Sequence, residues 1–198
     1  MTELIFATSN KAKAATLQQH FDRLGIAVKV VAKPLDLTEQ QADEALEVAE
    51  AKAQQAYQQL GVPLVVDDSA FHIPALNGFP GVYQKYVFYT IGPQGILKLM
   101  EGVEDRRAYF ISNLVYVDNR GKLHSFSDNK YWGTIATSYS KKGDIGWGGL
   151  GRLFIPQGSE VVSALLSHDE SYALGQAAGF EDAYAVFARW YVQQLNAS

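Results

Sequence analysis

Short apolar runs alternate with helical patterns over the first 66 residues, and this alternation constrains the fold more than any other feature. The apolar runs are too short for helices or are rich in β-branched residues, so each is expected to be a strand; they cover residues 4–7, 26–31 and 64–66. The helical patterns cover residues 11–24 and 43–60, and a glycine follows each as a stop. Strands that alternate with helices of this length predict an α/β fold with a parallel core.

The second half of the chain has a different pattern. Residues 108–117 and 122–126 flank a turn cluster and predict a long antiparallel hairpin, and residues 131–136 predict a further strand. A C-terminal helix is expected where Tyr184, Phe187, Ala188, Tyr191 and Leu195 share one face. We therefore expect a single α/β domain over residues 1–198, with a mixed sheet, two lobes flanking a central cleft and the hairpin in the second lobe.

Composition excludes several classes of function. The 198 residues include no Cys, which excludes disulfides, Cys-ligated zinc, iron–sulfur clusters and a thiol nucleophile. With 17 Lys and Arg against 21 Asp and Glu, the net charge is −4, which argues against a nucleic-acid polymer as partner but not against a small anionic ligand. No signal peptide and no apolar stretch of membrane-spanning length is visible, so we expect a cytoplasmic protein without a membrane partner.

The first candidate site lies between the first strand and the first helix, where Thr8, Ser9 and Asn10 precede Lys13. The N-terminus of a helix offers unpaired N–H groups and a partial positive charge, which suit a phosphate group. Lys13 is placed one turn into the helix, within reach of the same anion. The alternative is an ordinary helix cap with a solvated lysine.

The second candidate site is Asp67-Asp68-Ser69, at the predicted end of a buried strand. Ligands of open α/β sheets gather at the carboxyl ends of strands. Because neighbouring residues of an extended chain point in opposite directions, one Asp is free to face a cleft while the other secures the loop. A carboxylate beside a divalent cation acts as a ligand and as a base for water. The alternative is an Asp-rich turn.

Acidic residues before and within the second helix form a third candidate site. Glu39, Glu44 and Glu47 are candidate ligands for Mg²⁺, which prefers hard oxygen atoms, and they remain alternatives to one another. Lys52 lies off the apolar stripe of the helix and is therefore available to border a cleft. A solvated helix face is the alternative interpretation of these charges.

Six glycines lie between residues 143 and 158. The run G-W-G-G-L-G matches the dinucleotide-binding fingerprint formally, but no strand–turn–helix context surrounds it, so we reject that match. We expect instead a flexible substrate loop made by Trp147, Gly148 and Gly149, with the indole available for stacking. A set of tight structural turns is the alternative.

Taken in order, these segments resemble the inosine/xanthosine triphosphate pyrophosphatase family over most of the chain. The segments that carry the resemblance are TSNKAK (residues 8–13), DLTE (36–39), Lys52, DDSAF (67–71), ALNGFPGVY (75–83) and RAYF (107–110). The resemblance implies that a nucleoside triphosphate is cleaved between its α- and β-phosphates, and it implies a homodimer. It further implies that Asp68, Lys13 and Lys52 are catalytic residues, with both lysines holding the triphosphate, and that Thr8, Ser9, Asn10 and Ser69 bind substrate with Lys13. Glu39 and Asp68 would hold Mg²⁺, and Asp68 would orient or deprotonate the attacking water.

The chain departs from the family where the base would be read. The glycine loop reads GWGGLG (residues 146–151) where the family has G-F-G-Y-D-P, and residues 167–176 lack the family's Lys and its S-H-R motif. A pocket that loses its hydrogen-bonding groups loses discrimination, so we expect an altered or relaxed base preference. The alternatives are a nucleotide-binding protein that has lost catalysis and a hydrolase of a different modified nucleotide.

Overall fold

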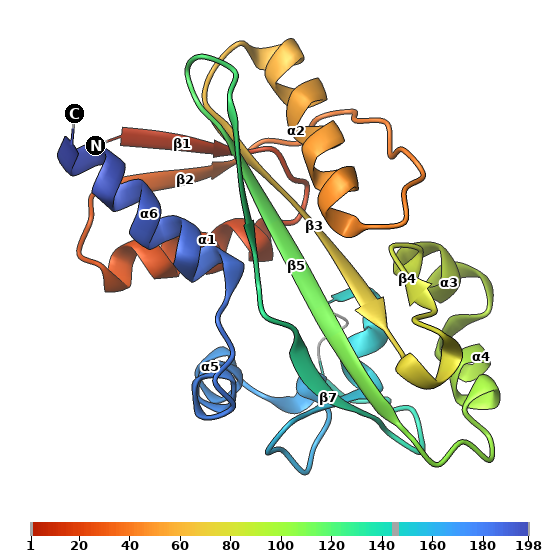
Figure 1. The fold of residues 1–198 in the computed structure, drawn as a ribbon. Coiled ribbons are helices and arrows are strands. Elements are labelled where there is room, and N and C mark those ends of the chain that lie inside the picture. Colours follow the sequence, from red (N-terminus) through yellow and green to blue (C-terminus); the bar gives the residue numbers. More distant parts are fainter. Residues whose placement is uncertain (1, 144–146, 198) are drawn as a thin grey trace. The chain divides into compact units, whose positions relative to one another are not determined.

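The computed structural model describes the backbone of residues 2–143 and 147–197 and confirms a mixed α/β fold (Figure 1). The described strands are β1 (Thr2–Phe6), β2 (Val28–Ala32), β3 (Leu64–His72), β4 (Pro80–Gly81), β5 (Arg107–Val117), β6 (Leu123–Ser127), β7 (Tyr131–Ile135) and β8 (Phe154–Pro156). The described α-helices are α1 (Lys11–Arg23), α2 (Ala45–Leu60), α3 (Gln84–Thr90), α4 (Gly92–Leu99), α5 (His168–Ala177) and α6 (Ala183–Ala197). The described 3₁₀ helices are η1 (Pro74–Leu76), η2 (Trp147–Arg152) and η3 (Ser163–Leu165).

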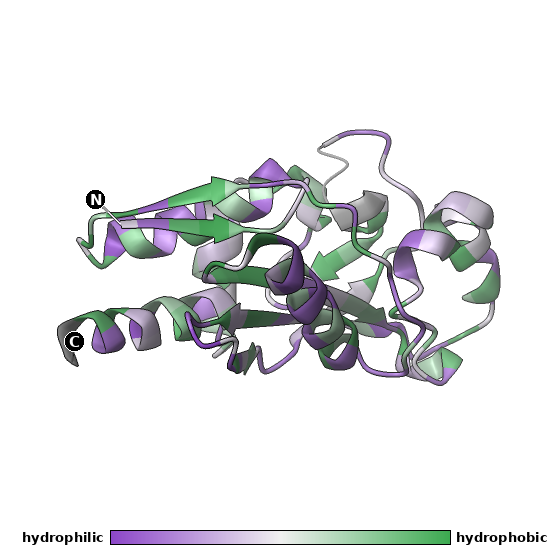
Figure 2. Cartoon of the chain, turned by 90° about the horizontal axis from the view of Figure 1, so that it is seen from above, coloured by the Kyte–Doolittle hydropathy of each residue, from purple (hydrophilic) through white to green (hydrophobic). Residues whose placement is uncertain are grey.

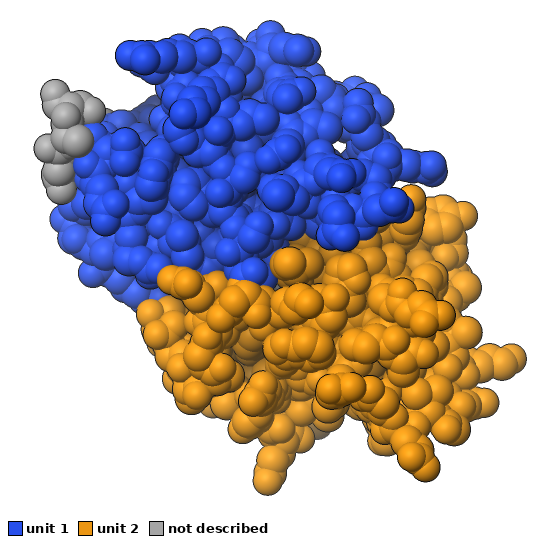
Figure 3. Space-filling model, in the orientation of Figure 1, with its two compact units in different colours: residues 1–68, 112–128, 182–198 blue, residues 69–111, 129–181 orange. Residues whose placement is uncertain are grey.

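The chain divides into two compact units, which Figure 3 shows in different colours. Unit 1 comprises residues 1–68, 112–128 and 182–198, and unit 2 comprises residues 69–111 and 129–181. Both β3 and β5 contribute residues to each unit. The strand order is β2-β1-β3-β5-β7-β8, with β4 paired to β3 and β6 paired to β5.

In unit 1, helices cover both faces of the sheet, and strand alternation decides which residue meets which helix. β1 pairs in parallel with β2 and β3, as the alternation of strands and helices predicts. Leu4 and Phe6 of β1 pack in one apolar cluster with residues of α1 and α6. Ile5, between them in β1, packs against a second cluster, which includes the alanines of α2. Successive residues of a strand face opposite sides, so the two clusters lie on opposite faces of the sheet.

The predicted helix boundaries in unit 1 follow from their caps. Asn10 is the N-cap of α1, where its side-chain oxygen accepts a hydrogen bond from the Ala12 N–H at 3.0 Å. Gly61 ends α2 in the left-handed conformation, with φ at 64°.

Two leucines in the predicted helices are exposed: Leu24, the C-cap of α1, and Leu195, near the end of α6. In α6, hydrophobic and hydrophilic residues alternate along the helix that leads to the C-terminus in Figure 2.

β3 is longer than the sequence predicts. The pattern placed the strand over residues 64–66, with Asp67, Asp68 and Ser69 following it, whereas the strand runs from Leu64 to His72. The prediction that the acidic pair lies at the strand's end is therefore wrong. The reason is that Ala70 and Phe71 are buried further along, which keeps the chain extended through the acidic pair in spite of the low strand propensity of Asp.

Unit 2 surrounds an aromatic core. The ring of Phe71 lies 4.4 Å from that of Phe110 and 6.0 Å from that of Phe154, centroid to centroid. β7 pairs antiparallel with the first residues of β5 and with β8. The predicted hairpin is confirmed as the β5–β6 pair, but its pairing runs from Asn113 to Val117 and its turn follows, so it belongs to unit 1 and not to a second lobe. β5 is long enough to pair with β7 through its first residues and with β6 through its last ones.

Short helices in unit 2 lie outside the sequence prediction. α3, α4 and α5 are seven, eight and ten residues long, too short for a clear apolar stripe. Across the described residues, no helix combines the length and the apolar character needed to cross a membrane.

Candidate active site

Two lysines meet two adjacent aspartates in unit 1. Lys13 and Lys52 come from α1 and α2, and Asp67 and Asp68 are neighbours on β3. Because neighbouring strand residues point to opposite faces, each Asp meets the lysine of the helix that covers its own face. The acidic pair is therefore divided between the two faces of the sheet.

On the face of α1 and α6, Lys13 pairs with Asp67. The Lys13 Nζ lies 2.7 Å from Asp67 Oδ2, and the Asp67 side chain is only 4% exposed against 32% for Lys13. The hydroxyl of Tyr184 donates a hydrogen bond to the same carboxylate oxygen at 2.8 Å. Asp67 thus contacts Tyr184 inside the core and Lys13 nearer the surface.

On the face of α2, Lys52 is shared by two carboxylates. Its Nζ donates to Asp68 Oδ1 at 2.7 Å and to Glu39 Oε1 at 2.9 Å. Lys52 and Asp68 are mostly buried, whereas the Glu39 side chain is 60% exposed. Glu39 comes from the segment before α2, so this contact brings the predicted acidic stretch to the aspartate pair.

Burial and charge shift the pKa values at this cluster. Burial by itself lowers the pKa of Lys52, but the charges and hydrogen bonds of Asp68 and Glu39 outweigh it, so the pKa of Lys52 is raised above its ordinary value. Burial raises the pKa of Asp68, and its contact with Lys52 and the charge of Lys13 offset this only in part. Burial is the largest influence on both pKa values, and partner charges outweigh it only at Lys52, which faces two carboxylates.

Thr8, Ser9 and Asn10 occupy the turn that opens α1, as predicted. The Asn10 N–H donates to Thr8 Oγ1 at 3.1 Å, and Ser9 and Asn10 are exposed. α1 has no acidic residue in its first turn, so the positive end of the helix dipole is not neutralised there by its own side chains. This turn and Lys13 offer an anion both N–H groups and an ammonium.

The donor set of Glu39 and Asp68 fits a hard cation that completes its coordination with water or ligand oxygens. Their nearest oxygens converge within 2.9 Å of one point, the Lys52 Nζ. In the part of the chain that the structure describes, no three or more His, Asp or Glu side chains gather into a metal-binding group. Glu44 caps α2 and Glu47 lies in its first turn, both exposed, and neither shares the contact of Glu39.

The other predicted site residues belong to unit 2. Ser69 is engaged by α3, because the Gln84 amide donates to its carbonyl oxygen at 2.7 Å and to its hydroxyl at 3.3 Å. Gly148 and Gly149 lie in η2, as does the backbone of Trp147, whose side chain is outside the described residues. A Cβ at Gly149 would lie 2.2 Å from the Phe88 ring, and its φ is +84°. Packing and backbone conformation both require glycine there, which favours the interpretation as a tight structural turn at that position.

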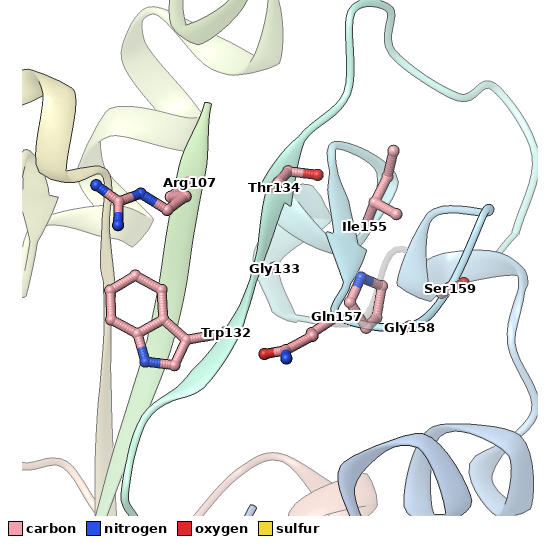
Figure 4. A pocket seen from close by; sticks show the side chains of 9 residues that line it. Arg107, Trp132, Gly133, Thr134, Ile155, Gln157, Gly158 and Ser159 are labelled. Carbon is pink, nitrogen blue, oxygen red and sulfur yellow. The ribbon is translucent and has the colours of Figure 1, made fainter. Parts of the chain in front are cut away.

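A pocket of about 390 Å³ lies elsewhere in unit 2 (Figure 4). Arg107 and Trp132 project into it from β5 and β7, and Gln157 lies nearby in Figure 4. Its lining residues include no carboxylate and none of the predicted site residues. The pocket therefore lacks the groups that the metal and phosphate chemistry of the acidic pair requires.

Tyr184 is a site residue that sequence reasoning missed. It lies on the apolar face of α6, where helical spacing marks it only as a core residue. Its hydroxyl partner, Asp67, is 117 positions away in the sequence. The one signal in the sequence is a tyrosine on a core face where an aliphatic residue would do. A buried hydroxyl needs a hydrogen-bond partner, so such a tyrosine indicates a polar contact in the core.

Comparisons with known proteins place the chain in a family. A dITP/XTP pyrophosphatase of Methanopyrus kandleri is 39% identical over 189 residues, covering 96% of this chain and 96% of that protein. A dITP/XTP pyrophosphatase of Thermococcus kodakarensis is 38% identical over 193 residues, covering 98% and 99%. The solved structure of the Staphylococcus aureus Ham1 protein matches with a TM-score of 0.77 at 20% identity, covering 98% of this chain and 100% of that one, and it supports the fold. The sequence profile of the Ham1 family matches residues 4–176, and the chain belongs to that family.

Proposed function

We propose that this protein is a Mg²⁺-dependent pyrophosphatase of non-standard nucleoside triphosphates such as dITP, ITP or XTP. It releases the nucleoside monophosphate and pyrophosphate. The observation that carries the proposal is the division of Asp67 and Asp68 between two lysines, with Glu39 joining the second pair. The names of the relatives, dITP/XTP pyrophosphatases at 39% and 38% identity over nearly the whole chain, point to the same activity.

The phosphate-binding role belongs to Lys13, Lys52 and the start of α1. Lys13 is partly exposed and is the third residue of α1, in the same first turn as the N–H groups that follow Thr8, Ser9 and Asn10. A triphosphate placed there meets cations and the positive end of a helix dipole. Phosphoryl transfer depends mainly on positioning and on neutralisation of charge, and these groups supply both.

Glu39 and Asp68 would hold Mg²⁺, which supplies charge neutralisation on the phosphate oxygens when bound. Asp68 accepts a proton from the attacking water as the water oxygen bonds to the α-phosphorus and the bond to the α–β bridging oxygen breaks. The leaving pyrophosphate takes that electron pair.

The base preference is proposed to be altered or relaxed. Gly149 brings no side chain to its loop, and Leu150 next to it is buried in the unit 2 core. Neither residue is able to donate or accept a side-chain hydrogen bond, and hydrogen bonds are what separate similar bases by large factors.

A substrate panel tests the proposed function. The protein is incubated with Mg²⁺ and dITP, ITP, XTP or ordinary nucleoside triphosphates, and pyrophosphate release is measured. We expect release from at least one non-standard nucleotide. If no nucleotide is hydrolysed by folded protein but calorimetry detects binding, the protein is a nucleotide-binding module. Turnover confined to a modified pyrimidine triphosphate would instead indicate a different modified nucleotide as substrate.

We also propose that two copies of the chain associate. Tyr86 and Tyr89 of α3 are 68% and 75% exposed, and large exposed aromatic residues are common at protein interfaces. Sedimentation equilibrium of the full chain tests this, and a monomer at micromolar concentration would contradict it.

A further inference from the structure

One carboxylate oxygen of Asp67 joins a buried tyrosine to a partly exposed lysine. Asp67 Oδ2 accepts the hydroxyl hydrogen bond of Tyr184 at 2.8 Å and lies 2.7 Å from the Lys13 Nζ. All three residues belong to unit 1. Both contacts use the same oxygen, so the direction in which the carboxylate faces the lysine depends on the tyrosine.

The three residues differ in burial: Tyr184 and Asp67 lie in the core, and Lys13 reaches the surface. Tyr184 is 7% exposed and the Asp67 side chain 4%, whereas the Lys13 side chain is 32% exposed. A buried carboxylate needs partners that replace its lost hydration. Tyr184 is such a partner on the core side, and the Lys13 ammonium is the partner on the surface side.

The start of α6 holds the tyrosine in place. The Tyr184 N–H donates to Asp182 Oδ1 at 2.9 Å, and Asp182 Oδ2 lies 2.9 Å from the Nε2 of His20. His20 lies on α1, the helix that also carries Lys13. The tyrosine and the lysine are thus tied to each other through Asp67 and through the His20–Asp182 contact.

We propose that Tyr184 is a positioning residue that orients Asp67 and so sets where Lys13 presents its ammonium to the phosphate groups of the substrate. The inference rests on the proposed function and adds to it a residue that touches neither substrate nor metal. Burial, followed by the charge of Asp67 and the hydrogen bond to it, raises the pKa of Tyr184 well above its ordinary value. A tyrosine hydroxyl is protonated at neutral pH, so it is available to Asp67 as a hydrogen-bond donor.

The variant Tyr184→Phe removes this donor and keeps the ring. The variant keeps the Lys13 ammonium and its charge and changes only its placement, so we expect KM for the best nucleotide to rise about five- to tenfold while kcat stays within about twofold of wild type. The inhibition constant of inorganic tripolyphosphate, which has no base or sugar, should rise by a similar factor. The matched control is Tyr191→Phe, on the same helix and equally 7% exposed, which should change neither quantity.

A second background separates positioning from general support of the fold. If Tyr184 acts through Lys13, then Tyr184→Phe should change tripolyphosphate binding less than about twofold in a Lys13→Met background, measured by calorimetry with Mg²⁺. An undiminished effect in that background, or an unchanged KM in the single variant, would overturn the proposal. If Tyr184→Phe does not fold, Asp67→Asn replaces it, because it disturbs the same oxygen and should weaken tripolyphosphate binding more than Tyr191→Phe does.

The same calorimetry keeps the two proposals distinguishable. A wild-type protein that hydrolyses no nucleotide contradicts the proposed function, yet its binding of tripolyphosphate still measures the effect of Tyr184. If wild type does not bind tripolyphosphate at all, the role of Lys13 at a phosphate site is wrong and the positioning role of Tyr184 falls with it.

Discussion

The Lys52 Nζ lies 2.7 Å from Asp68 Oδ1, on the face of β3 opposite to the one where Asp67 meets Lys13. Two neighbouring residues of one strand thus form separate ion pairs with two different helices. On the α2 face the two carboxylates, Asp68 and Glu39, suit a metal ion, and Lys52 between them is proposed to bind phosphate. The pair on the α1 face adjoins a helix N-terminus and suits phosphate.

Asp68→Asn should abolish turnover and preserve the fold. The amide keeps the shape of the side chain but cannot accept the proton of the attacking water, so kcat should fall about 10²- to 10⁴-fold. Pyrophosphate release and circular dichroism measure the two effects. Asp105→Asn, which alters an exposed pair with Arg107, serves as the control and should leave kcat unchanged. Retained activity in Asp68→Asn would place the base elsewhere.

Glu39→Gln should raise the Mg²⁺ concentration needed for half-maximal activity about tenfold. Glu39 contacts Lys52 together with Asp68, so the substitution removes one of the two carboxylates proposed to bind Mg²⁺. A Mg²⁺ titration of activity measures the shift. Glu44→Gln and Glu47→Gln, on the exposed start of α2, are the matched controls. A larger shift in either control would assign the metal to that residue instead.

Lys52→Met should destabilise the protein by about 2–4 kcal/mol. Removing the ammonium leaves the mostly buried Asp68 without its closest cation, which costs more than the ion pair itself is worth. Urea unfolding near neutral pH measures the change. Lys29→Met breaks an exposed pair with Glu3, which solvent screens, and should change stability far less. Equal effects of the two substitutions would show that Lys52 and Asp68 are not a buried pair in solution.

Tyr116→Phe should reduce the loss of stability at alkaline pH. Burial, followed by the charges of Tyr191 and Asp118, raises the pKa of Tyr116 from 10.0 to about 12. Between these values the unfolded chain loses its proton while the native chain keeps it, so stability falls as pH rises, by up to about 1.4 kcal/mol per pH unit. Tyr116→Phe has no hydroxyl to titrate at this position, so this part of the pH dependence of its stability is absent. Urea unfolding from pH 9 to 11.5 should show a shallower decline than wild type or the exposed control Tyr83→Phe, and parallel declines would contradict it.

Most of the arrangement proposed to bind phosphate and metal follows from local sequence. Asn10 is a capping residue type directly before a helical pattern, and it caps α1 in the structure. The opposite directions of Asp67 and Asp68 follow from strand geometry, although the strand continues beyond them. Each of these outcomes depends on residues within one or two helical turns of each other, where local rules apply.

The alternation of strands and helices determined the α/β fold, and the order of Asp67, Asp68, Lys13 and Lys52 along it determined which groups were available. Tertiary structure alone decided that Glu39, and not Glu44 or Glu47, reaches Lys52, and that Tyr184 reaches Asp67. The physical reason is that the loop carrying Glu39 is held against α2 by hydrogen bonds between Thr38 and Gln55, and the start of α6 is held by the apolar cluster in which Tyr184 packs. Contacts between residues so far apart depend on which apolar faces meet, which no local pattern specifies.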